Sequence, residues 1–387
     1  MNAYNFEFQI KTKIKFGRNK ITEIPAILKK ENRKKLMIVV DQGIKQAGIL
    51  AKVTDVLADQ VDYCIFDQVE PDPTLAIVSA GVKYAVEEEA DAILAVGGGS
   101  PIDSAKAIRS ALESEKMDTE AELVSRQCLL ITVPTTSGSG SEVTKTIVIT
   151  DSHNKHKFAA TSDELAPEIS IVDPELTRTL PASLTAIGGM DALSHCVEAY
   201  TSKDAVLPFE MIATKGIQMV NDNLRPAVGN PDNMDARTGM SLASLFGGIA
   251  FSNCGLGLVH AIAHPLGGKY KIPHGLVNSM ILAEVMNFNL ISNPAKFANI
   301  ARLMGVDTSQ MTEMEAAHRS IEEVRNLVSD ISIHSTLSDF GVKNLEEIAE
   351  LALEEKVMLK SNPRPVSKED IIAVSYTHLT LPTILRV

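Results

Sequence analysis

The segment AILAVGGGSPIDSAKAI, residues 92–108, has the pattern of a buried strand, a glycine turn and the start of a helix. Five apolar residues precede three glycines, and Ser100 and Pro101 are residue types favoured where a helix begins. Glycines let a ligand approach the backbone, and the free N–H groups of a helix start attract phosphate. The segment therefore predicts a phosphate site, although a tight turn without a ligand has the same pattern.

Four further apolar runs predict strands around this segment. They are LMIVV (36–40), YCIF (63–66), LLITV (129–133) and ISIV (169–172). Helical stretches with polar faces lie between several of them, and such alternation favours a parallel sheet. Before these runs, apolar and polar residues alternate through NFEFQIKTKIKF (5–16), which predicts an antiparallel hairpin or an edge strand.

The character of the chain changes near residue 180. Beyond Pro181 the strand patterns fade, and long helical patterns such as DALSHCVEAY and NLEEIAELAL dominate. We therefore predict an α/β domain over residues 1–180 and an all-helical domain over residues 181–374. A ligand site is expected where two such domains meet.

A second loop and one acidic residue indicate what the glycine turn binds. The segment LLITVPTTSGSGSEVT (129–144) places hydroxyl side chains around two glycines, where they suit a phosphate, ribose or carboxamide group. Asp41 directly follows LMIVV, where a carboxylate can hydrogen-bond a ribose diol, although an isolated acid there is more often a helix cap. Together these features predict a nucleotide across the carboxyl edge of a Rossmann-like sheet, whereas either loop alone also fits a solvated turn.

The helical part of the chain contains five side chains of the types that bind metal ions. Two segments, GGMDALSHCVEAY and GLGLVHAIAHPLGGKYKIPHG, carry them: Asp191, His195, His260, His264 and His274. Residues four apart on a helix share one face, and most of the neighbours are apolar or glycine. One histidine in such a setting is usually a hydrogen-bonded core residue, but a carboxylate with several imidazoles suits a divalent metal ion.

The residue types also limit the chemistry. HAIAH lacks the glutamate of the zincin motif, so a protease of that class is not expected. A ligand set without thiolate fits Fe²⁺ or Zn²⁺, and Zn²⁺ binds more tightly to such sets. A metal ion facing a nicotinamide is an arrangement for hydride transfer, because the metal stabilises the alkoxide that transfers hydride to the cofactor. The residues therefore predict a metal-dependent oxidoreductase.

Four segments resemble the signatures of the iron-containing (group III) alcohol dehydrogenases: GGGSPIDSAK, TTSGSGSEVT, GGMDALSHCVEAY and GLGLVHAIAHPLGGKYKIPHG. The similarity extends from about residue 5 to about residue 372. It is strongest to family members that act on small primary alcohols, such as butanol, lactaldehyde/propanediol and 1,3-propanediol dehydrogenases. It implies a dinucleotide-binding α/β domain with a helical metal domain, Fe²⁺ (or Zn²⁺ in its place) and NAD(H) as cofactors, and a homodimer or larger homo-oligomer.

The resemblance also implies roles for single residues. The implied metal ligands are Asp191, His195, His260 and His274. His264 is implied to remain free of the metal and to act near the nicotinamide and substrate. The implied cofactor-binding residues are Gly97, Gly98, Gly99 and Ser100 at the pyrophosphate, Thr135, Thr136 and Lys157 along the cofactor, and Asp41 at the adenosine ribose.

Two features depart from the family pattern. Ala283 occupies a position where the family usually has a proline, which is only a local change. The ending VSYTHLTLPTILRV breaks an amphipathic helix with β-branched residues and Pro382. We predict that residues 375–387 are a non-native tail that is exposed and loosely packed.

The composition limits the partners and the location. The 387 residues include 37 basic and 49 acidic ones, for a net charge of −12, which disfavours nucleic acid and anionic membrane surfaces as partners. No signal peptide, membrane span or C-x-x-C pair is visible, so a cytoplasmic location fits best.

Two other functions stay open. One is a metal-dependent lyase or cyclase related to dehydroquinate synthase, which binds NAD without net consumption. Such an enzyme needs a basic patch for its acidic substrate, and near the histidine segments we find only Lys269 and Lys271. The other is a metallohydrolase without a redox role.

Overall fold

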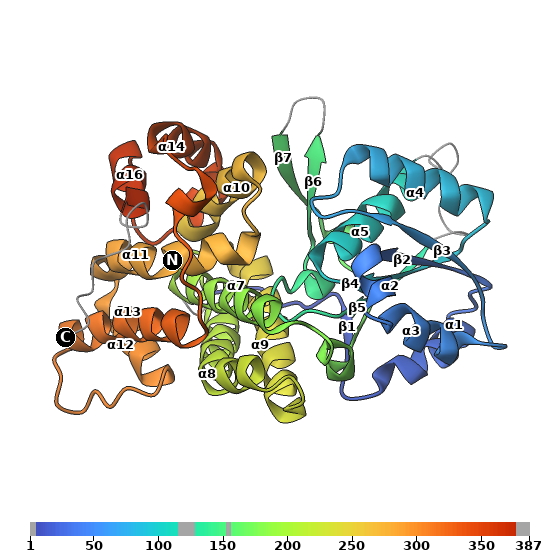
Figure 1. Cartoon of the computed structure of the whole chain (residues 1–387), viewed down its shortest axis with the longest axis horizontal. Helices are drawn as coiled ribbons and strands as arrows, with labels where there is room; N and C mark the ends of the chain where they lie inside the picture. Colours follow the sequence, from blue (N-terminus) through green and yellow to red (C-terminus); the bar gives the residue numbers. More distant parts are fainter. Residues whose placement is uncertain (1–4, 115–127, 152–155, 377–387) are drawn as a thin grey trace. The chain divides into compact units, whose positions relative to one another are not determined.

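A computed structural model of the chain describes residues 5–114, 128–151 and 156–376. These residues divide into two compact units. Residues 9–180 form the N-terminal unit, and the C-terminal unit begins at Pro181 and also includes residues 5–8. Figure 1 labels most helices and strands of each unit.

The N-terminal unit contains a six-stranded sheet (Figure 1). In spatial order its strands are β1 (Lys13–Phe16), β8 (Ile169–Val172), β5 (Leu129–Pro134), β4 (Ala92–Gly97), β2 (Lys35–Asp41) and β3 (Asp62–Val69). Every neighbouring pair runs parallel. The prediction of a Rossmann-like parallel sheet is therefore confirmed.

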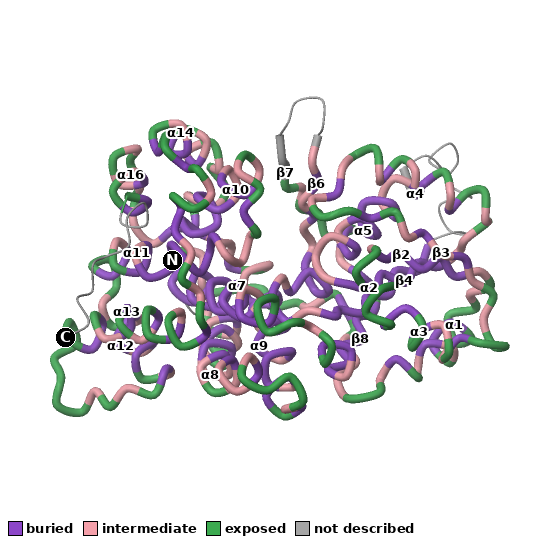
Figure 2. The backbone as a smooth tube through the Cα atoms, viewed as in Figure 1, coloured by how far each residue is buried: buried purple, intermediate pink, exposed green. Residues whose placement is uncertain are grey.

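Helices cover both faces of this sheet. They are α1 (Ile24–Lys30), α2 (Gln42–Gln46), α3 (Ile49–Leu57), α4 (Leu75–Glu87) and α5 (Gly99–Ser114). Helices α1 and α3 pack on the face to which β2 contributes Leu36 and Ile38, and α4 and α5 pack on the face to which it contributes Met37 and Val39. Strands buried on both faces need apolar residues throughout, and Figure 2 shows β2 and β4 as largely buried.

The order of the strands reverses beside β2. The chain passes from β2 to β3 on one side and then reaches β4 on the other side of β2. Helix α3 follows β2 and the short α2, and helix α5 follows β4. These two helices accordingly pack on opposite faces of the sheet. Ligands of such sheets bind outside the carboxyl ends of the strands at this reversal. The residues at these two strand ends are Asp41 and Gly97.

One of the two alternatives for the N-terminal segment is wrong, and one pair of strands was not expected. The alternating N-terminal segment does supply an edge strand, but β1 covers only Lys13–Phe16 and pairs in parallel with β8 rather than in a hairpin. Alternation shows which side chains share a face and does not specify the direction of pairing. The structure also contains an antiparallel hairpin that was not predicted, formed by β6 (Thr146–Asp151) and β7 (His156–Thr161).

Among its described residues, the C-terminal unit contains helices and connecting loops and no strand. Its helices are α7 (Ala182–Thr201), α8 (Leu207–Gly229), α9 (Met234–Cys254), α10 (Leu258–Tyr270), α11 (His274–Asn289), α12 (Pro294–Leu303), α13 (Glu313–Asp330), α14 (Leu345–Glu354), α15 (Lys356–Ser361) and α16 (Lys368–Tyr376). Helix α7 packs against α8, α9 and α11 and is buried along most of its length. Polar side chains on α7 therefore lie in the interior of this unit.

No single helix in the described ranges is both long enough and apolar enough to cross a membrane. Helices α9 and α10 meet the length and composition requirements only as a pair, and they are bent by 104° relative to each other.

The end of the chain differs in part from the prediction. Helix α16 continues to Tyr376, and Ser375 within it is 1% exposed. Ser375 is therefore packed rather than exposed, because the helix extends past the point where we predicted a break. Residues 377–387 lie outside the described residues, so for them the proposed non-native tail stays a prediction.

Candidate functional site

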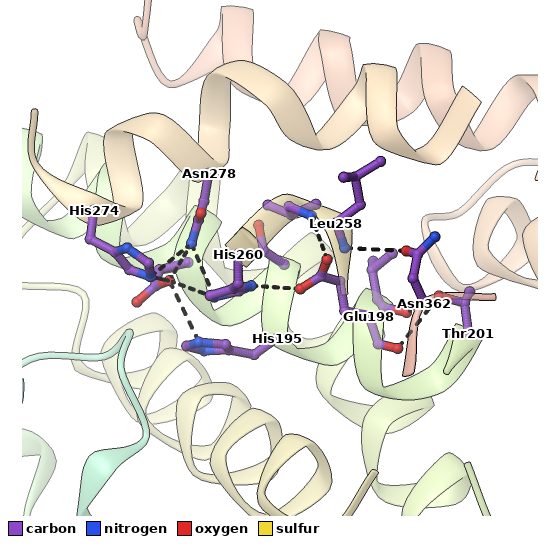
Figure 3. Close-up of polar contacts among 12 residues, drawn as sticks. His195, Glu198, Thr201, Leu258, His260, His274, Asn278 and Asn362 are labelled. Carbon is purple, nitrogen blue, oxygen red and sulfur yellow. Dashed lines mark hydrogen bonds and ion pairs between the residues drawn. The ribbon is translucent and has the colours of Figure 1, made fainter. Parts of the chain in front are cut away.

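In the C-terminal unit, one carboxylate oxygen of Asp191 is surrounded by the imidazoles of His195, His260 and His274, which are labelled in Figure 3. Asp191 and His195 lie one turn apart on α7, His260 lies on α10, and His274 is the first residue of α11. The Oδ1 atom of Asp191 is 3.7 Å from Nε2 of His195, and its distances to Nε2 of His260 and His274 are 3.8 Å and 3.7 Å. The ligand atoms of Asp191, His195 and His260 all lie within 4.8 Å of one another.

These distances fit a shared cation better than direct hydrogen bonds. Hydrogen bonds from nitrogen to oxygen are usually shorter than about 3.2 Å, and all three nitrogens lie farther away than this. A tetrahedral metal ion with bonds of about 2.1 Å holds its ligand atoms about 3.4 Å apart. One carboxylate oxygen, three imidazole nitrogens and no thiolate form a donor set suited to Fe²⁺ or Zn²⁺.

The electrostatics of this cluster favour a positive charge. Burial raises the pKa of Asp191, but the three neighbouring histidines outweigh burial and lower that pKa below its usual range. Burial lowers the pKa of His260, but Glu198 and Asp191 outweigh it and raise that pKa to about 9. Burial lowers the pKa of His274. A bound metal needs the lone pair on His260, so metal binding displaces its proton.

Glu198 orients His260. Its Oε2 atom accepts a hydrogen bond from Nδ1 of His260 at 2.5 Å, and its Oε1 atom accepts the N–H of Val259 at 2.7 Å. Because Nδ1 is held by a carboxylate, Nε2 is left to face Asp191, as is usual for a metal-bound histidine. Glu198 was not predicted, although it follows Asp191 by seven residues and His195 by three and so shares their face of α7.

Asn278, one turn after His274 on α11, completes the cluster. Its Nδ2 atom donates to Oδ1 of Asp191 at 2.8 Å and lies 3.3 Å from Nε2 of both His260 and His274. Its own Oδ1 atom is buried and has no hydrogen-bond partner among the described residues. The sequence analysis missed Asn278 as well, and its spacing from His274 is the signal that would have found it.

The start of α11 is pressed against α7, which brings His274 to the cluster. A side chain at Gly275 would place its Cβ atom 2.4 Å from the carbonyl oxygen of Ile187 on α7. Real Cβ atoms do not approach a backbone oxygen this closely, so the position requires glycine. The position of His274 therefore depends on the residue that follows it.

His264 lies beside this cluster rather than in it. It follows His260 by one turn of α10, and its ring centroid is 5.8 Å from that of His274. Its Nδ1 atom is 3.0 Å from Oε1 of Glu355. Asp191 thus has His195, His260 and His274 around its Oδ1 atom, while His264 has a carboxylate partner of its own.

The glycine turn of the N-terminal unit connects β4 to α5. Gly97 has a φ angle of +152°, and a Cβ atom there would lie 2.6 Å from Cγ of Pro101, so this position also requires glycine. Helix α5 begins at Gly99, which places Ser100 inside the first turn rather than before the helix. The free N–H groups of this first turn therefore lie at the carboxyl end of β4.

The loop that follows β5, residues 135–144, carries the Ser and Thr side chains described above, and we call it the hydroxyl loop. It lies directly against the glycine turn. The N–H of Thr135 donates to the carbonyl oxygen of Gly97 at 3.0 Å. A Cβ atom at Gly98 would lie 3.3 Å from Oγ1 of Thr136. The two loops that the sequence singled out thus form one surface at the ends of the adjacent strands β4 and β5.

Asp41 takes the capping role that its position allows. It ends β2, and its Oδ1 atom accepts the N–H of Ile44 at 2.9 Å at the start of α2. Lys45, the nearest positive charge in sequence, pairs with Asp67 at 3.0 Å. Lys157 lies in β7, and its side chain lies outside the described part of the structure.

A second buried cluster, which we call the lysine cluster, ties α5 to the hydroxyl loop. The Nζ atom of the buried Lys106 donates to Oγ of Ser141 at 3.1 Å, to Oγ1 of Thr144 at 2.9 Å and to the carbonyl oxygen of Thr146 at 3.0 Å. Asp103, one turn earlier on α5, lies 3.8 Å from the same nitrogen. This cluster holds the helix that follows the glycine turn, and the sequence analysis did not identify it.

Family models match both halves of the chain. Residues 11–174 match a model described as iron-containing alcohol dehydrogenase. Residues 185–378 match the C-terminal model of the Fe-containing alcohol dehydrogenase family. A 1,3-propanediol dehydrogenase from Citrobacter freundii is 39% identical over 383 residues, which cover 97% of this chain and 99% of that protein.

Solved structures match nearly the full length of the chain as well. A 1,3-propanediol oxidoreductase has a TM-score of 0.92 at 38% identity, with 97% of this chain and 100% of that chain covered. A sulfoacetaldehyde reductase from Bifidobacterium kashiwanohense in complex with NAD⁺ has a TM-score of 0.87 at 25% identity, with 97% and 99% covered.

Proposed function

This chain belongs to the iron-containing alcohol dehydrogenase family, and on that premise we propose the ligands of its iron: Asp191, His195, His260 and His274. The chain is an NAD-dependent alcohol/aldehyde oxidoreductase with iron and NAD(H) as its cofactors. One observation carries the ligand assignment. A single oxygen of Asp191 lies 3.7–3.8 Å from three imidazole nitrogens, which suits a shared cation.

The side chains around the proposed metal position have distinct roles. Asp191 supplies negative charge, and Asn278 holds its Oδ1 atom by a hydrogen bond. Glu198 keeps the Nε2 lone pair of His260 directed at Asp191. A divalent cation bound there supplies Lewis acidity, which lowers the pKa of an alcohol hydroxyl and so favours hydride transfer to NAD⁺. His264, outside the ligand set, accepts or relays the proton.

For the cofactor, we place the pyrophosphate at the glycine turn and the hydroxyl loop along the cofactor. The pyrophosphate residues are Gly97, Gly98, Gly99 and Ser100, and those along the cofactor are Thr135, Thr136 and Lys157. This placement is supported by the reversal of strand order between β2 and β4. Asp41, at the end of β2, is our candidate for the adenosine ribose, where its charge would repel the 2′-phosphate of NADP(H) by roughly 1 kcal/mol in water.

We further propose that the substrate is a small primary alcohol or its aldehyde. The 39% identity to a 1,3-propanediol dehydrogenase over nearly the whole chain supports this class. We also propose a homodimer or larger homo-oligomer in the cytoplasm. The net charge of −12 gives no reason to expect nucleic acid or a membrane as a partner. A lyase or cyclase that binds NAD without consuming it is not favoured, because the matched proteins are oxidoreductases.

Metal analysis of histidine variants tests the ligand assignment. We expect His260→Ala and His274→Ala each to lose the metal, and with it roughly 100-fold or more of the rate. His264→Ala should keep the metal and lose rate, because it acts outside the ligand set. The measurements are the iron content after anaerobic reconstitution and the oxidation of NADH by a short aldehyde.

His318, an exposed residue of α13, provides the matched control. His318→Ala should keep both iron and rate. A metal-free His264→Ala protein together with an iron-loaded His274→Ala protein would reverse the assignment of these two residues. NADH that stays unconsumed in the presence of aldehyde would contradict the oxidoreductase function itself.

A further inference from the structure

One carboxylate outside the metal cluster contacts a residue of the proposed reaction. Oε1 of Glu355 lies 3.0 Å from Nδ1 of His264. Glu355 is the residue between α14 and α15, where it ends one helix and caps the next. The side chains of His264 and Glu355 are 14% and 25% exposed. Most of the contact is therefore shielded from water, which makes it stronger than an ordinary surface pair.

The segment that carries Glu355 is fixed to α10 at a second place. Asn362, just beyond α15, accepts the N–H of Leu258 through its Oδ1 atom at 3.2 Å (Figure 3). The same side chain exchanges two hydrogen bonds of 2.9 Å with Asn289 and is 1% exposed. Helix α10 is thus held at its first residue by Asn362 and nearly two turns later by Glu355. This double attachment limits the movement of Glu355 relative to His264.

We infer that Glu355 is the positioning residue of His264, an assignment that rests on the proposed role of His264 in the reaction. A neutral imidazole carries one N–H group. The carboxylate accepts this group at Nδ1, so the Nε2 atom of His264 keeps its lone pair and can accept a proton. The same hydrogen bond restricts rotation of the ring and so holds Nε2 in one position.

The competing role for Glu355 is to hold α10 against the α14–α15 segment. Another ion pair already makes that connection, because Lys269 on α10 pairs with Glu347 on α14. Both carboxylates are partly exposed and both join α10 to the same part of the fold. Glu355 contacts His264, whereas Glu347 contacts Lys269. Glu347→Ala is therefore a matched control for Glu355→Ala.

The test measures aldehyde reduction by NADH with iron-loaded enzyme. Glu355→Ala should lower kcat roughly 10- to 100-fold, the usual range for a residue that orients an active-site group. Its iron content and its KM for NADH should stay at the parent values. Glu355→Gln should lose less rate, because the amide oxygen can still accept from Nδ1. Glu347→Ala should keep the parent kcat.

A double variant shows whether Glu355 acts through the histidine. In a His264→Ala background, Glu355→Ala should cause no further loss of kcat, because the ring that it orients is gone. Additive losses in the double variant, loss of iron in Glu355→Ala, or equal losses in Glu355→Ala and Glu347→Ala would each overturn the inference and leave the metal ligands as proposed. Full kcat in His264→Ala would instead overturn the role proposed for that histidine, and this inference with it.

Discussion

Each unit of the chain buries a cluster of polar side chains, and the two clusters are built in opposite ways. The lysine cluster of the N-terminal unit contains its own cation, since Nζ of Lys106 lies within 3.1 Å of three oxygen atoms. In the C-terminal unit, one oxygen of Asp191 faces three imidazole nitrogens at 3.7–3.8 Å. The first cluster is complete within the chain. The second has the spacing of ligands around a cation that the chain does not supply.

The difference separates a buried structural network from a metal site. Both clusters begin from the same helical pattern, an acid followed one turn later by a basic residue: Asp103 and Lys106 on α5, and Asp191 and His195 on α7. Burying a charge costs several kcal/mol unless partners lie within hydrogen-bonding distance. Lys106 has such partners, whereas the direct hydrogen bond to Asp191 comes from the neutral amide of Asn278. The three imidazole nitrogens that offset the burial of Asp191 lie at the spacing of ligands around a cation rather than at hydrogen-bonding distance, which indicates an external cation.

The largest effect we expect is from removing the internal cation. Lys106→Met should lower the free energy of unfolding by about 3–5 kcal/mol, because breaking a buried ionic network leaves its remaining members uncompensated. Burial lowers the pKa of Lys106 only to about 8, so the side chain is charged at pH 7 and its loss is felt there. Urea unfolding of the metal-free protein measures the change.

Lys83, on α4 with 78% of its side chain exposed, provides the control for this substitution. Lys83→Met should change the free energy of unfolding by less than about 0.5 kcal/mol. The iron affinity of Lys106→Met should equal that of the parent, because the two clusters lie in different units. A Lys106→Met protein as stable as the Lys83→Met protein would show that the lysine cluster does not depend on its cation.

The second effect concerns pH and a further acid of the hydroxyl loop. Burial raises the pKa of Glu142 from 4.5 to about 7. Between pH 4.5 and pH 7, Glu142 keeps a proton in the folded chain that it has released in the unfolded chain. The contribution of Glu142 to the free energy of unfolding is therefore complete below pH 4.5 and is lost as the pH rises through 7. At about 1.4 kcal/mol per pH unit, the loss from this group amounts to about 3 kcal/mol.

Glu142→Gln should remove this part of the pH dependence. Relative to the parent, the variant should gain about 3 kcal/mol in free energy of unfolding between pH 4 and pH 8. Urea unfolding at several pH values in this interval measures the free energy of unfolding. Glu346 is exposed, so Glu346→Gln is the control. Parent and variant profiles that run parallel would contradict the prediction.

The strands could be predicted because burial on both faces leaves a clear trace in the sequence. All six residues of β4 are buried, and its run AILAVG has no polar side chain. The direction of β1 could not be predicted, since alternation at Lys13–Phe16 is the same for either direction and the open edge of β8 determines the pairing. The β6–β7 hairpin was missed because the segments that form it, TIVITD and HKFAAT, were given no strand assignment.

That Asp191 and several histidines form one cluster could be predicted because histidines in apolar surroundings are costly without partners. The choice of four proposed ligands among the five candidates came from the family resemblance. Glu198 and Asn278 were missed for a different reason. On helices that are buried on several sides, the sequence does not show which polar residues point at one another. Asp103 and Lys106 were missed because charged residues one turn apart usually form a solvated surface, and their burial follows only from the contact between α5 and the hydroxyl loop.

The smallest effect we expect tests the open cluster by changing one hydrogen bond and no ligand. In Glu198→Gln, the amide can donate to Nδ1 of His260, which favours the tautomer with its proton on Nε2. That proton occupies the position that faces Asp191, so iron affinity should fall roughly 10- to 100-fold.

Chelator competition measures the affinity. Glu210→Gln, at a partly buried ion pair with Lys296 on other helices of the same unit, is the control and should leave the affinity unchanged. The metal-free Glu198→Gln protein should lose less stability than Lys106→Met, because the amide oxygen still accepts from Val259. If Glu198→Gln instead lost more stability than Lys106→Met and kept the parent iron affinity, Glu198 would belong to a network that is complete within the chain, like that of Lys106. The contrast between the two clusters would then fail.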